Sequence, residues 1–219
     1  MLRTILTRFV TGIVLLSLLL FIPSGSFKYY NAWFLLALII IPITYVTVYF
    51  YNRDPEFLRR RLKMHEKEKE QRLIIKLASL LYILGFIIPG LDYRYGWSDV
   101  PLWLVLFSGG VFLFSYLLVF KVFKTNSFAS RVVEVESGQK VIDSGPYSVL
   151  RHPMYTGTVL MMLFMPLLLG SYYGLIPNVL LPPVFIFRLL NEEKVLTRDL
   201  PGYKEYCDRV KYRLIPYIW

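Results

Sequence analysis

Six long apolar blocks dominate this 219-residue chain and constrain its fold more than any other feature. Each block approaches the roughly 20 residues that an α-helix needs to cross a bilayer. They lack the alternation of apolar and polar residues that is typical of a half-buried soluble element. With 56% hydrophobic residues in all, the chain is predicted to be an all-α integral membrane protein with about six transmembrane helices. The predicted spans are residues 5–22, 31–51, 73–91, 101–123, 153–170 and 172–190.

The last two predicted spans are short and carry prolines inside them, at positions 166, 177, 182 and 183. A proline in a span frees backbone groups that must then be satisfied within the protein. We therefore expect this pair to form a broken or kinked hairpin that packs on the other helices. We expect the first block to be a retained span, because Pro23-Ser24-Gly25-Ser26 follows it in place of an Ala-x-Ala cleavage site.

The basic residues of this chain, whose formal net charge is +10, fall almost entirely on one side of the predicted membrane. Arg3 and Arg8 precede the first span, and basic residues crowd the segments 52–72, 121–152 and 188–219, whereas the opposite loops carry only Lys28 and Arg94. This asymmetry predicts that both termini are cytoplasmic. Because the charges lie between apolar spans, their expected partners are membrane lipids and not nucleic acid.

A cytoplasmic basic helix is predicted over 54–72, beginning with Asp54 as cap and Pro55 as first residue. A solvated connecting helix is its simplest role. The single cysteine, Cys207, cannot form an internal disulfide and is interpreted as an unreactive thiol in a C-terminal helix.

The strongest functional signal is the polar run Gly145 to Gly157, at the start of the fifth span. It contains Tyr147, Arg151-His152 and Tyr155, with Pro153 opening the helix, a position that leaves free amides for an anion. Taken one at a time, these residues have simple structural roles: Arg151 as a topology charge, His152 as a cap, and the tyrosines as interfacial residues. Gathered in one tight loop, they indicate a ligand site, with Arg151 the member most readily explained by topology alone.

A second polar group closes the sixth span. Arg188 and Glu192 are four residues apart and share a helix face, whereas Glu193 points about 100° away. The pair has two interpretations: it neutralises itself, or it faces the polar run and binds a ligand. Farther on, Tyr203 and Tyr206 share a face of a predicted cytoplasmic helix, which packs either on the polar run or on the membrane, and an extended end follows it.

At these residues the sequence resembles the isoprenylcysteine carboxyl methyltransferase family and its prokaryotic relatives. The resemblance covers about 131–219 and rests on four pieces in order: Gly-x-Tyr at 145–147, Arg-His-Pro-x-Tyr-x-Gly at 151–157, Arg-x-x-x-Glu-Glu at 188–193, and the Tyr-x-x-Tyr…Arg-x-x-x-Pro tail. It divides the chain into an N-terminal part, 1–130, with four spans, and a methyltransferase core, 131–219. It also implies a multi-pass protein of a prokaryotic plasma membrane.

The resemblance implies S-adenosylmethionine as methyl donor and a cytoplasmic cofactor pocket, with no metal. By motif match, Arg188 meets the substrate and, with Glu192, forms the catalytic pair. The cofactor site is formed by Lys140, Val141, Ile142, Tyr147, His152, Pro153, Met154, Tyr155 and Glu192. The family has glutamine where Glu134 stands, so Glu134 is left out. The implied acceptor is a lipophilic small molecule or prenylated substrate that enters from the bilayer and presents a carboxylate.

The chemistry agrees with these residue types. Methyl transfer from a sulfonium is an in-line displacement, so positioning and exclusion of water supply most of the acceleration. A carboxylate acceptor is already ionised at neutral pH, so no general base is needed. The main alternative is an NADPH-dependent reductase of a sterol-like or isoprenoid double bond, because membrane sterol reductases have a similar ending near Tyr206 to Pro216. A channel is disfavoured by the lack of polar residues along the first four spans.

Overall fold

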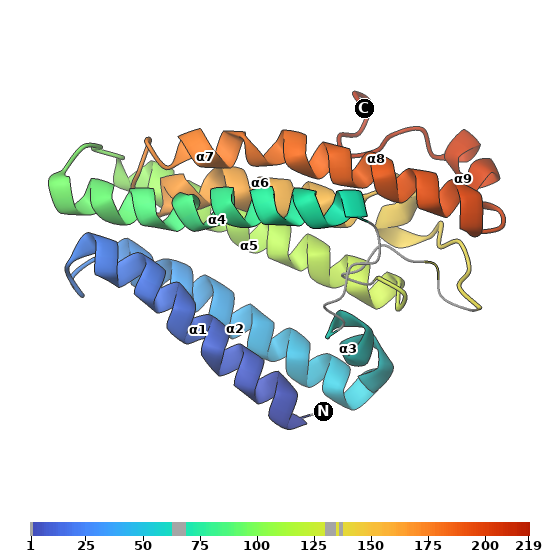
Figure 1. The fold of residues 1–219 in the computed structure, drawn as a ribbon, viewed down its shortest axis with the longest axis horizontal. Helices are drawn as coiled ribbons and strands as arrows, with labels where there is room; N and C mark the ends of the chain where they lie inside the picture. Colours follow the sequence, from blue (N-terminus) through green and yellow to red (C-terminus); the bar gives the residue numbers. More distant parts are fainter. Residues whose placement is uncertain (1, 63–68, 130–134, 136–137) are drawn as a thin grey trace.

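The computed structural model describes residues 2–62, 69–129, 135 and 138–219, and all its regular elements there are helical (Figure 1). Five helical segments are long and apolar enough to cross a membrane. They are α1 (Leu2–Ser24), α2 (Tyr30–Arg53), most of α4 (Lys69–Tyr95), α5 (Leu102–Thr125), and the stretch Leu175–Asp199 that holds α7 (Leu175–Val179) and α8 (Leu181–Asp199). The apolar helix α6 (Pro153–Leu168) is shorter. The predicted all-α membrane fold is confirmed, with five full-length candidate spans and this short sixth helix.

The predicted break in the last pair of helices is present. α7 ends at Val179, and α8 begins two residues later, with Pro182 and Pro183 in its first turn, where a missing amide hydrogen costs no helical bond. α8 then continues to Asp199, well beyond the predicted end of the span at 190. The apolar block therefore covers only the first half of this helix, and the polar residues of the site lie from Arg188 onward.

The predicted basic helix over 54–72 begins as expected but is shorter. Asp54 caps α3 (Pro55–Arg61) by accepting a hydrogen bond from the Phe57 amide at 3.0 Å. Phe57 is buried against Phe50 and Phe123, which fixes α3 on the ends of α2 and α5. Residues 63–68 of this predicted helix lie outside the described part of the chain.

Close helix packing sets the position of α6. A side chain at Gly157 would place its Cβ 2.7 Å from Val119 Cγ2 and 3.0 Å from the Ser115 carbonyl oxygen, so only glycine allows α5 and α6 to approach this closely. Toward the other end of the molecule, a core cluster that includes Leu20, Leu35, Phe86 and Leu168 joins α1, α2, α4 and α6. The start of α6 is thereby held against the end of α5.

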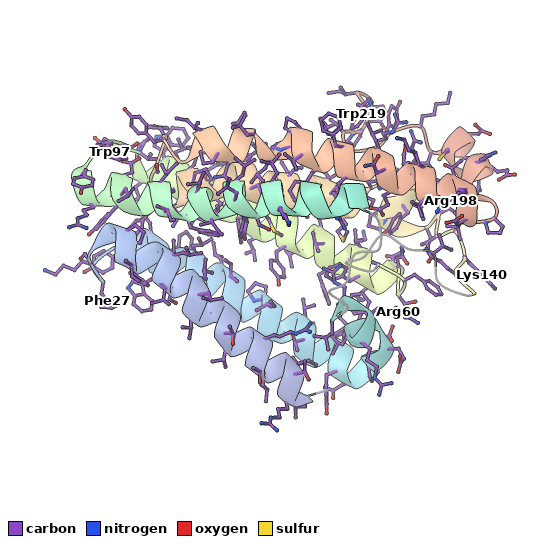
Figure 2. All side chains as sticks on the ribbon, viewed as in Figure 1. Phe27, Arg60, Trp97, Lys140, Arg198 and Trp219 are labelled. Atoms are coloured by element: carbon purple, nitrogen blue, oxygen red, sulfur yellow. The ribbon has the colours of Figure 1, made fainter. Side chains whose placement is uncertain are left out.

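The two ends of the molecule differ in composition. The N-terminus, the C-terminus, α3 and α9 (Tyr203–Arg209) lie at one end, whereas the α1–α2 and α4–α5 connections lie at the other (Figure 1). Figure 2 shows Arg60, Lys140 and Arg198 at the first end and the aromatic residues Phe27 and Trp97 at the second. The segments predicted to carry the site therefore share the end that holds both termini.

Candidate active site

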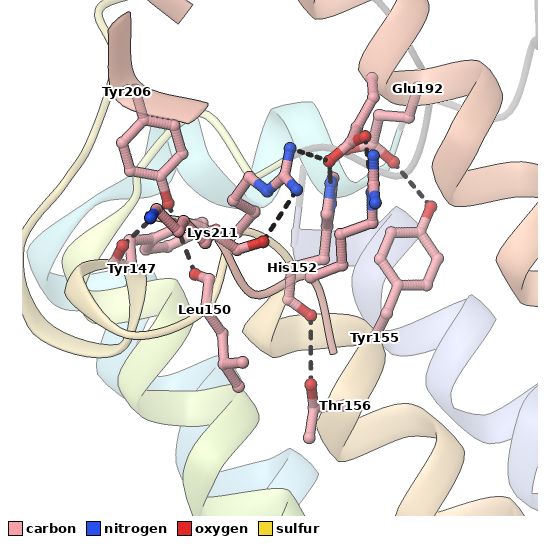
Figure 3. A network of polar contacts seen from close by, with 11 residues as sticks. Tyr147, Leu150, His152, Tyr155, Thr156, Glu192, Tyr206 and Lys211 are labelled. Carbon is pink, nitrogen blue, oxygen red and sulfur yellow. Dashed lines mark hydrogen bonds and ion pairs between the residues drawn. The ribbon is translucent and has the colours of Figure 1, made fainter. Parts of the chain in front are cut away.

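The polar run begins with a short 3-10 helix, Gly145–Ser148, whose first residue has to be glycine. Gly145 has φ of +58°, and an added Cβ would lie 3.0 Å from Thr125 Oγ1 at the end of α5. This turn holds Tyr147 from two directions. Asn126 Nδ2 donates to the Tyr147 hydroxyl at 3.1 Å. The Tyr206 hydroxyl donates to the Tyr147 carbonyl at 2.8 Å (Figure 3).

The C-terminal segment runs along the start of α6 and fastens it. The amides of Arg151 and His152 donate to the carbonyls of Tyr212 and Arg213, at 2.9 and 3.0 Å. The Thr156 hydroxyl donates to the Leu214 carbonyl at 2.8 Å. The end predicted to be extended instead bends at 213–215 and turns at 216–218, where the Trp219 amide donates to the Ile215 carbonyl. Its bonds to Arg151, His152 and Thr156 hold that segment in place.

A buried carboxylate, Glu193, gathers three basic side chains behind this segment. Glu193 Oε1 lies 3.0 Å from an Arg151 terminal nitrogen and 3.1 Å from His152 Nε2, and its Oε2 accepts from Arg213 Nε at 2.9 Å. We call these four residues the Glu193 cluster. Because a buried charge is stable only when paired and hydrogen-bonded, the cluster fixes the orientation of Arg151 and His152.

A second chain of contacts lies on the neighbouring face of α8. The Tyr155 hydroxyl donates to Glu192 Oε2 at 2.6 Å (Figure 3). The same hydroxyl accepts from Arg188 Nε at 3.2 Å. Tyr155 is 5% exposed, so its ring stands between α6 and α8 as a fixed spacer. The predicted shared face of Arg188 and Glu192 is present, and the hydroxyl of Tyr155 joins the two side chains.

These residues surround a cavity of about 430 Å³, which is within the usual size range of small-molecule sites. Polar side chains in its lining include Gln139, Lys140, Tyr147, Tyr203 and Tyr206. Side chains of α4, α5, α6 and α8 also line it, and most of them are apolar: Ala78, Tyr82, Val119, Phe123, Met162, Val184 and Phe185, with Ser79 and Thr158 among them. Arg188, Glu192 and Tyr155 also line the cavity. One cavity therefore has surface suited both to a polar ligand and to an apolar chain.

The structure gathers almost the whole predicted site around this cavity. Lys140, Val141, Ile142, Tyr147, His152, Met154, Tyr155, Arg188 and Glu192 all line it. Pro153 does not; it is buried at the first position of α6, where it starts the helix. Of the two tyrosines of the C-terminal helix, Tyr206 packs on the polar run and bonds the Tyr147 carbonyl, and Tyr203 is buried beside it in a cluster that includes Leu200 and Val141.

Two simple interpretations of the polar run are wrong. Arg151 is not a topology charge alone, because its side chain is 9% exposed, pairs with Glu193 and donates to the Lys211 carbonyl. His152 stands at the N-cap position of α6, but its side chain makes no capping bond and faces Glu193 instead. In both cases the partner is 40 or so residues away in the chain, beyond the reach of a local pattern.

Burial keeps the tyrosines of this region neutral. It raises the pKa of Tyr147 to about 12, and the hydrogen bond from Asn126 opposes the shift only in part. Burial likewise raises the pKa of Tyr203 and of Tyr206 above the ordinary value of a phenol. At physiological pH these hydroxyls act as neutral hydrogen-bonding groups and not as bases.

Sequence reasoning missed several residues of the site. Glu193, Arg213 and Asn126 were not assigned to it, although Glu193 belongs to the Glu-Glu pair and Arg213 to the Arg-x-x-x-Pro tail. Their positions in these motifs could have assigned Glu193 and Arg213 to the site. No sequence signal could have assigned Asn126, because nothing local distinguishes an asparagine that ends a span from one that bonds a distant tyrosine.

The fold and the cavity define a class of membrane protein with an internal polar site at one end of its helices. Residues 103–201 match the family model described as phospholipid methyltransferase, a family within the superfamily of membrane methyltransferases related to the isoprenylcysteine enzymes. A stretch of 96 residues is also 32% identical to the delta(14)-sterol reductase TM7SF2 of Mus musculus. That stretch covers 40% of this chain and 22% of the reductase, so this chain spans about a fifth of that relative's length. The family match supports the membrane methyltransferase class, whose members generally use S-adenosylmethionine.

Proposed function

We propose that this protein transfers a methyl group from S-adenosylmethionine to a lipophilic acceptor, and that the acceptor group is a carboxylate of the isoprenylcysteine type. The observation that carries the proposal is the Arg188–Tyr155–Glu192 chain, which lines the same cavity as apolar side chains of α4, α5, α6 and α8. A reaction between a soluble donor and a lipid acceptor requires polar and apolar groups around one space. The match to the phospholipid methyltransferase model over 103–201 supports the same reaction class.

The polar lining of the cavity fits the donor. Glu192 uses Oε2 for Tyr155, and among the described residues its Oε1 makes no hydrogen bond. That oxygen is therefore available to a ribose hydroxyl or an amino group. The rings of Tyr147 and Tyr155 line the same space, and a tyrosine face attracts a cation by about 0.5–1 kcal/mol. S-adenosylmethionine supplies an electrophilic methyl group on a sulfonium cation when bound.

Arg188 is the residue proposed to orient the acceptor. Its guanidinium is fixed through Nε on the Tyr155 hydroxyl, and a planar guanidinium can hold a carboxylate with two parallel hydrogen bonds. The carboxylate would then lie beside the donor end of the cavity with one oxygen directed at the methyl group. Holding the two reactants in line replaces an improbable encounter by a single oriented complex.

The apolar lining of the cavity is proposed to take the acceptor's hydrocarbon chain. This lining comes from α4, α5, α6 and α8, which are apolar at membrane depth. A lipid chain in this space would exclude water from the reacting groups and strengthen their electrostatic interactions. The acceptor is therefore expected to be a prenylated or otherwise long-chain molecule that enters from the bilayer.

The second candidate is a reductase that uses NADPH, favoured by the 32% identity to a sterol reductase. A ligand titration separates the two. Purified protein in neutral detergent is titrated with S-adenosylmethionine, S-adenosylhomocysteine and NADPH, and the midpoint of thermal unfolding is followed. The methyltransferase predicts a rise with both sulfur compounds, whereas a rise with NADPH alone would reject it.

A transfer assay then addresses the acceptor. The protein is incubated with methyl-labelled donor and with a prenylcysteine, its carboxamide analogue, and a phospholipid bearing a primary amine. Label in the prenylcysteine but not in the carboxamide supports a carboxylate acceptor. Label in the phospholipid alone would retain the methyltransferase and replace the acceptor.

A further inference from the structure

The outer face of α8 carries an open groove on the opposite side of the helix wall from the cavity. Its lining on α8 is one stripe with helical spacing, made of Phe187, Leu190, Asn191, Lys194, Thr197 and Arg198. Lys204 from α9, Arg213 from the C-terminal segment and Glu193 complete it. We call this the outer groove. No residue of the predicted site lies in it.

The groove is apolar at one end and basic at the other. Phe187 is 65% exposed, and the described cations Lys194, Lys204 and Arg213 lie farther along, with Arg198 beside Asp199. From Phe187 to Arg198 the helix rises about 16 Å, about the depth from the acyl chains to the headgroup layer. This order of surfaces matches a membrane lipid with its chain along Phe187 and an acidic headgroup among the lysines.

Arg213 makes the groove more than a surface charge. Its Nε donates to Glu193 Oε2 at 2.9 Å, and its guanidinium lies over the Trp219 ring, 5.2 Å from the centroid. Among the described residues, the Arg213 guanidinium makes one hydrogen bond, to Glu193. The Arg213 side chain is 29% exposed. The terminal nitrogens of a guanidinium held in this way are well placed to hold a phosphate.

We propose that the outer groove binds the phosphate of an anionic membrane phospholipid. Lys194, Lys204 and Arg213 hold the phosphate, and the side of α8 near Phe187 holds the acyl chain. Basic pockets at the ends of membrane helices bind acidic headgroups because several cations act together on one phosphate. The occupant is a bound lipid and not the methyl acceptor, since Glu193 and α8 separate the groove from the cavity.

The site is tested by titrating purified protein in neutral detergent with phosphatidylglycerol, phosphatidylcholine of the same chains, and inorganic phosphate. We expect phosphatidylglycerol to raise the unfolding midpoint and the other two to leave it unchanged. The double variant Lys194→Gln/Lys204→Gln should weaken phosphatidylglycerol binding roughly tenfold or more. The matched control is Arg53→Gln/Arg59→Gln, which removes the same charge from exposed residues of α2 and α3 and should bind normally.

Three results would overturn the proposal. Equal loss in the two double variants would mean a general effect of surface charge. A response to phosphatidylcholine would mean a chain effect without headgroup recognition. A response to inorganic phosphate at the same concentrations would mean an anion site that does not select a lipid. Unfolding midpoints in phosphatidylcholine show whether each variant is folded.

The groove also has a route to the cavity, and this part of the inference rests on the proposed function. Arg213 and the cavity residues Arg151 and His152 share the Glu193 carboxylate. We expect phosphatidylglycerol to tighten S-adenosylhomocysteine binding severalfold in the wild type and not in Lys194→Gln/Lys204→Gln. If phosphatidylglycerol left the S-adenosylhomocysteine affinity of the wild type unchanged, the outer groove and the cavity would be energetically independent. Absence of S-adenosylhomocysteine binding in any lipid would instead reject the proposed function and leave the lipid site standing.

Discussion

Two acidic residues at opposite ends of the bundle, Asp92 buried and Glu192 partly buried, differ in how their oxygens are hydrogen-bonded. Asp92, near the end of α4, is 2% exposed and accepts hydrogen bonds from the Ser98 amide, the Ser98 hydroxyl and the Ser171 hydroxyl. Among the described residues Glu192 accepts one, from Tyr155, and its side chain lines the cavity. The first carboxylate is satisfied by the fold alone, and the second is satisfied only in part.

The contrast separates a structural acid from a functional one. Asp92 joins the α4–α5 connection to the α6–α7 connection through Ser171, whose hydroxyl also accepts from the Gly174 amide at 2.9 Å. A buried polar group with all its partners stabilises one arrangement of the chain. A carboxylate with an open oxygen at a cavity instead has binding capacity left for a ligand. The predictions below test this difference, beginning with the largest effect.

Arg188→Ala should lower turnover on the order of 10²- to 10³-fold, because the acceptor loses the group that aligns it. The affinity for S-adenosylhomocysteine should change little. Methyl-transfer rates and thermal-shift titrations measure the two quantities on the same preparation. Loss of donor affinity with acceptor binding retained would reverse the role assigned to Arg188.

Glu192→Gln should weaken donor binding roughly 10- to 100-fold, since a charge-assisted hydrogen bond is exchanged for a neutral one. The unfolding midpoint without ligand should stay close to that of the wild type. Asn191→Ala on the adjacent helix position, outside the cavity, is the control and should bind normally. A large fall in stability for Glu192→Gln would place Glu192 with Asp92 among the structural acids.

Asp92→Asn should lower the stability of the protein and leave donor binding nearly unchanged, the reverse of Glu192→Gln. Replacing a carboxylate that accepts three hydrogen bonds should cost about 1–3 kcal/mol of unfolding free energy, because at least one hydroxyl or amide loses its acceptor. Donor affinity of the folded protein should remain within about twofold, as for independent sites far apart. Calorimetry and ligand titration check both. Weaker donor binding at unchanged stability would contradict the comparison.

Tyr206→Phe should cost about 1 kcal/mol, the usual value of one buried hydrogen bond, here the bond to the Tyr147 carbonyl. Because that bond fixes the turn that presents Tyr147, donor affinity should fall by a few-fold as well. Tyr212→Phe, whose hydroxyl makes no hydrogen bond among the described residues, is the control. If the two variants had the same stability and the same donor affinity, the Tyr206 hydroxyl would have no role in the site.

The smallest expected effect is on alkaline stability. Burial raises the pKa of Tyr147 to about 12, so the folded protein keeps this proton where the unfolded chain releases it, above about pH 10. Its contribution is complete below pH 10 and is lost as the pH rises toward 12. Unfolding midpoints between pH 9 and 11 should fall less steeply in Tyr147→Phe. An equal slope would show that folding does not raise the pKa of Tyr147.

Much of this molecule follows from local sequence. The apolar blocks predicted the helices, Asp54-Pro55 predicted the start of α3, and the prolines at 182 and 183 predicted the break before α8. The residues that the motif matches named for the site line one cavity, except Pro153, and their roles stay predictions. Local prediction succeeded where neighbouring residues decide the outcome, as in helix formation, capping and the face that Arg188 shares with Glu192.

The roles within the polar clusters did not follow from the sequence. His152 could be assigned to a cap and Arg151 to topology because their partner, Glu193, arrives from another helix. The sequence by itself determined the spans, the basic end and the residue types of the site. Only the tertiary structure decided which carboxylate is closed by its neighbours and which faces a cavity. The reason is that hydrogen-bond saturation depends on groups brought together across long stretches of chain, and no local pattern records them.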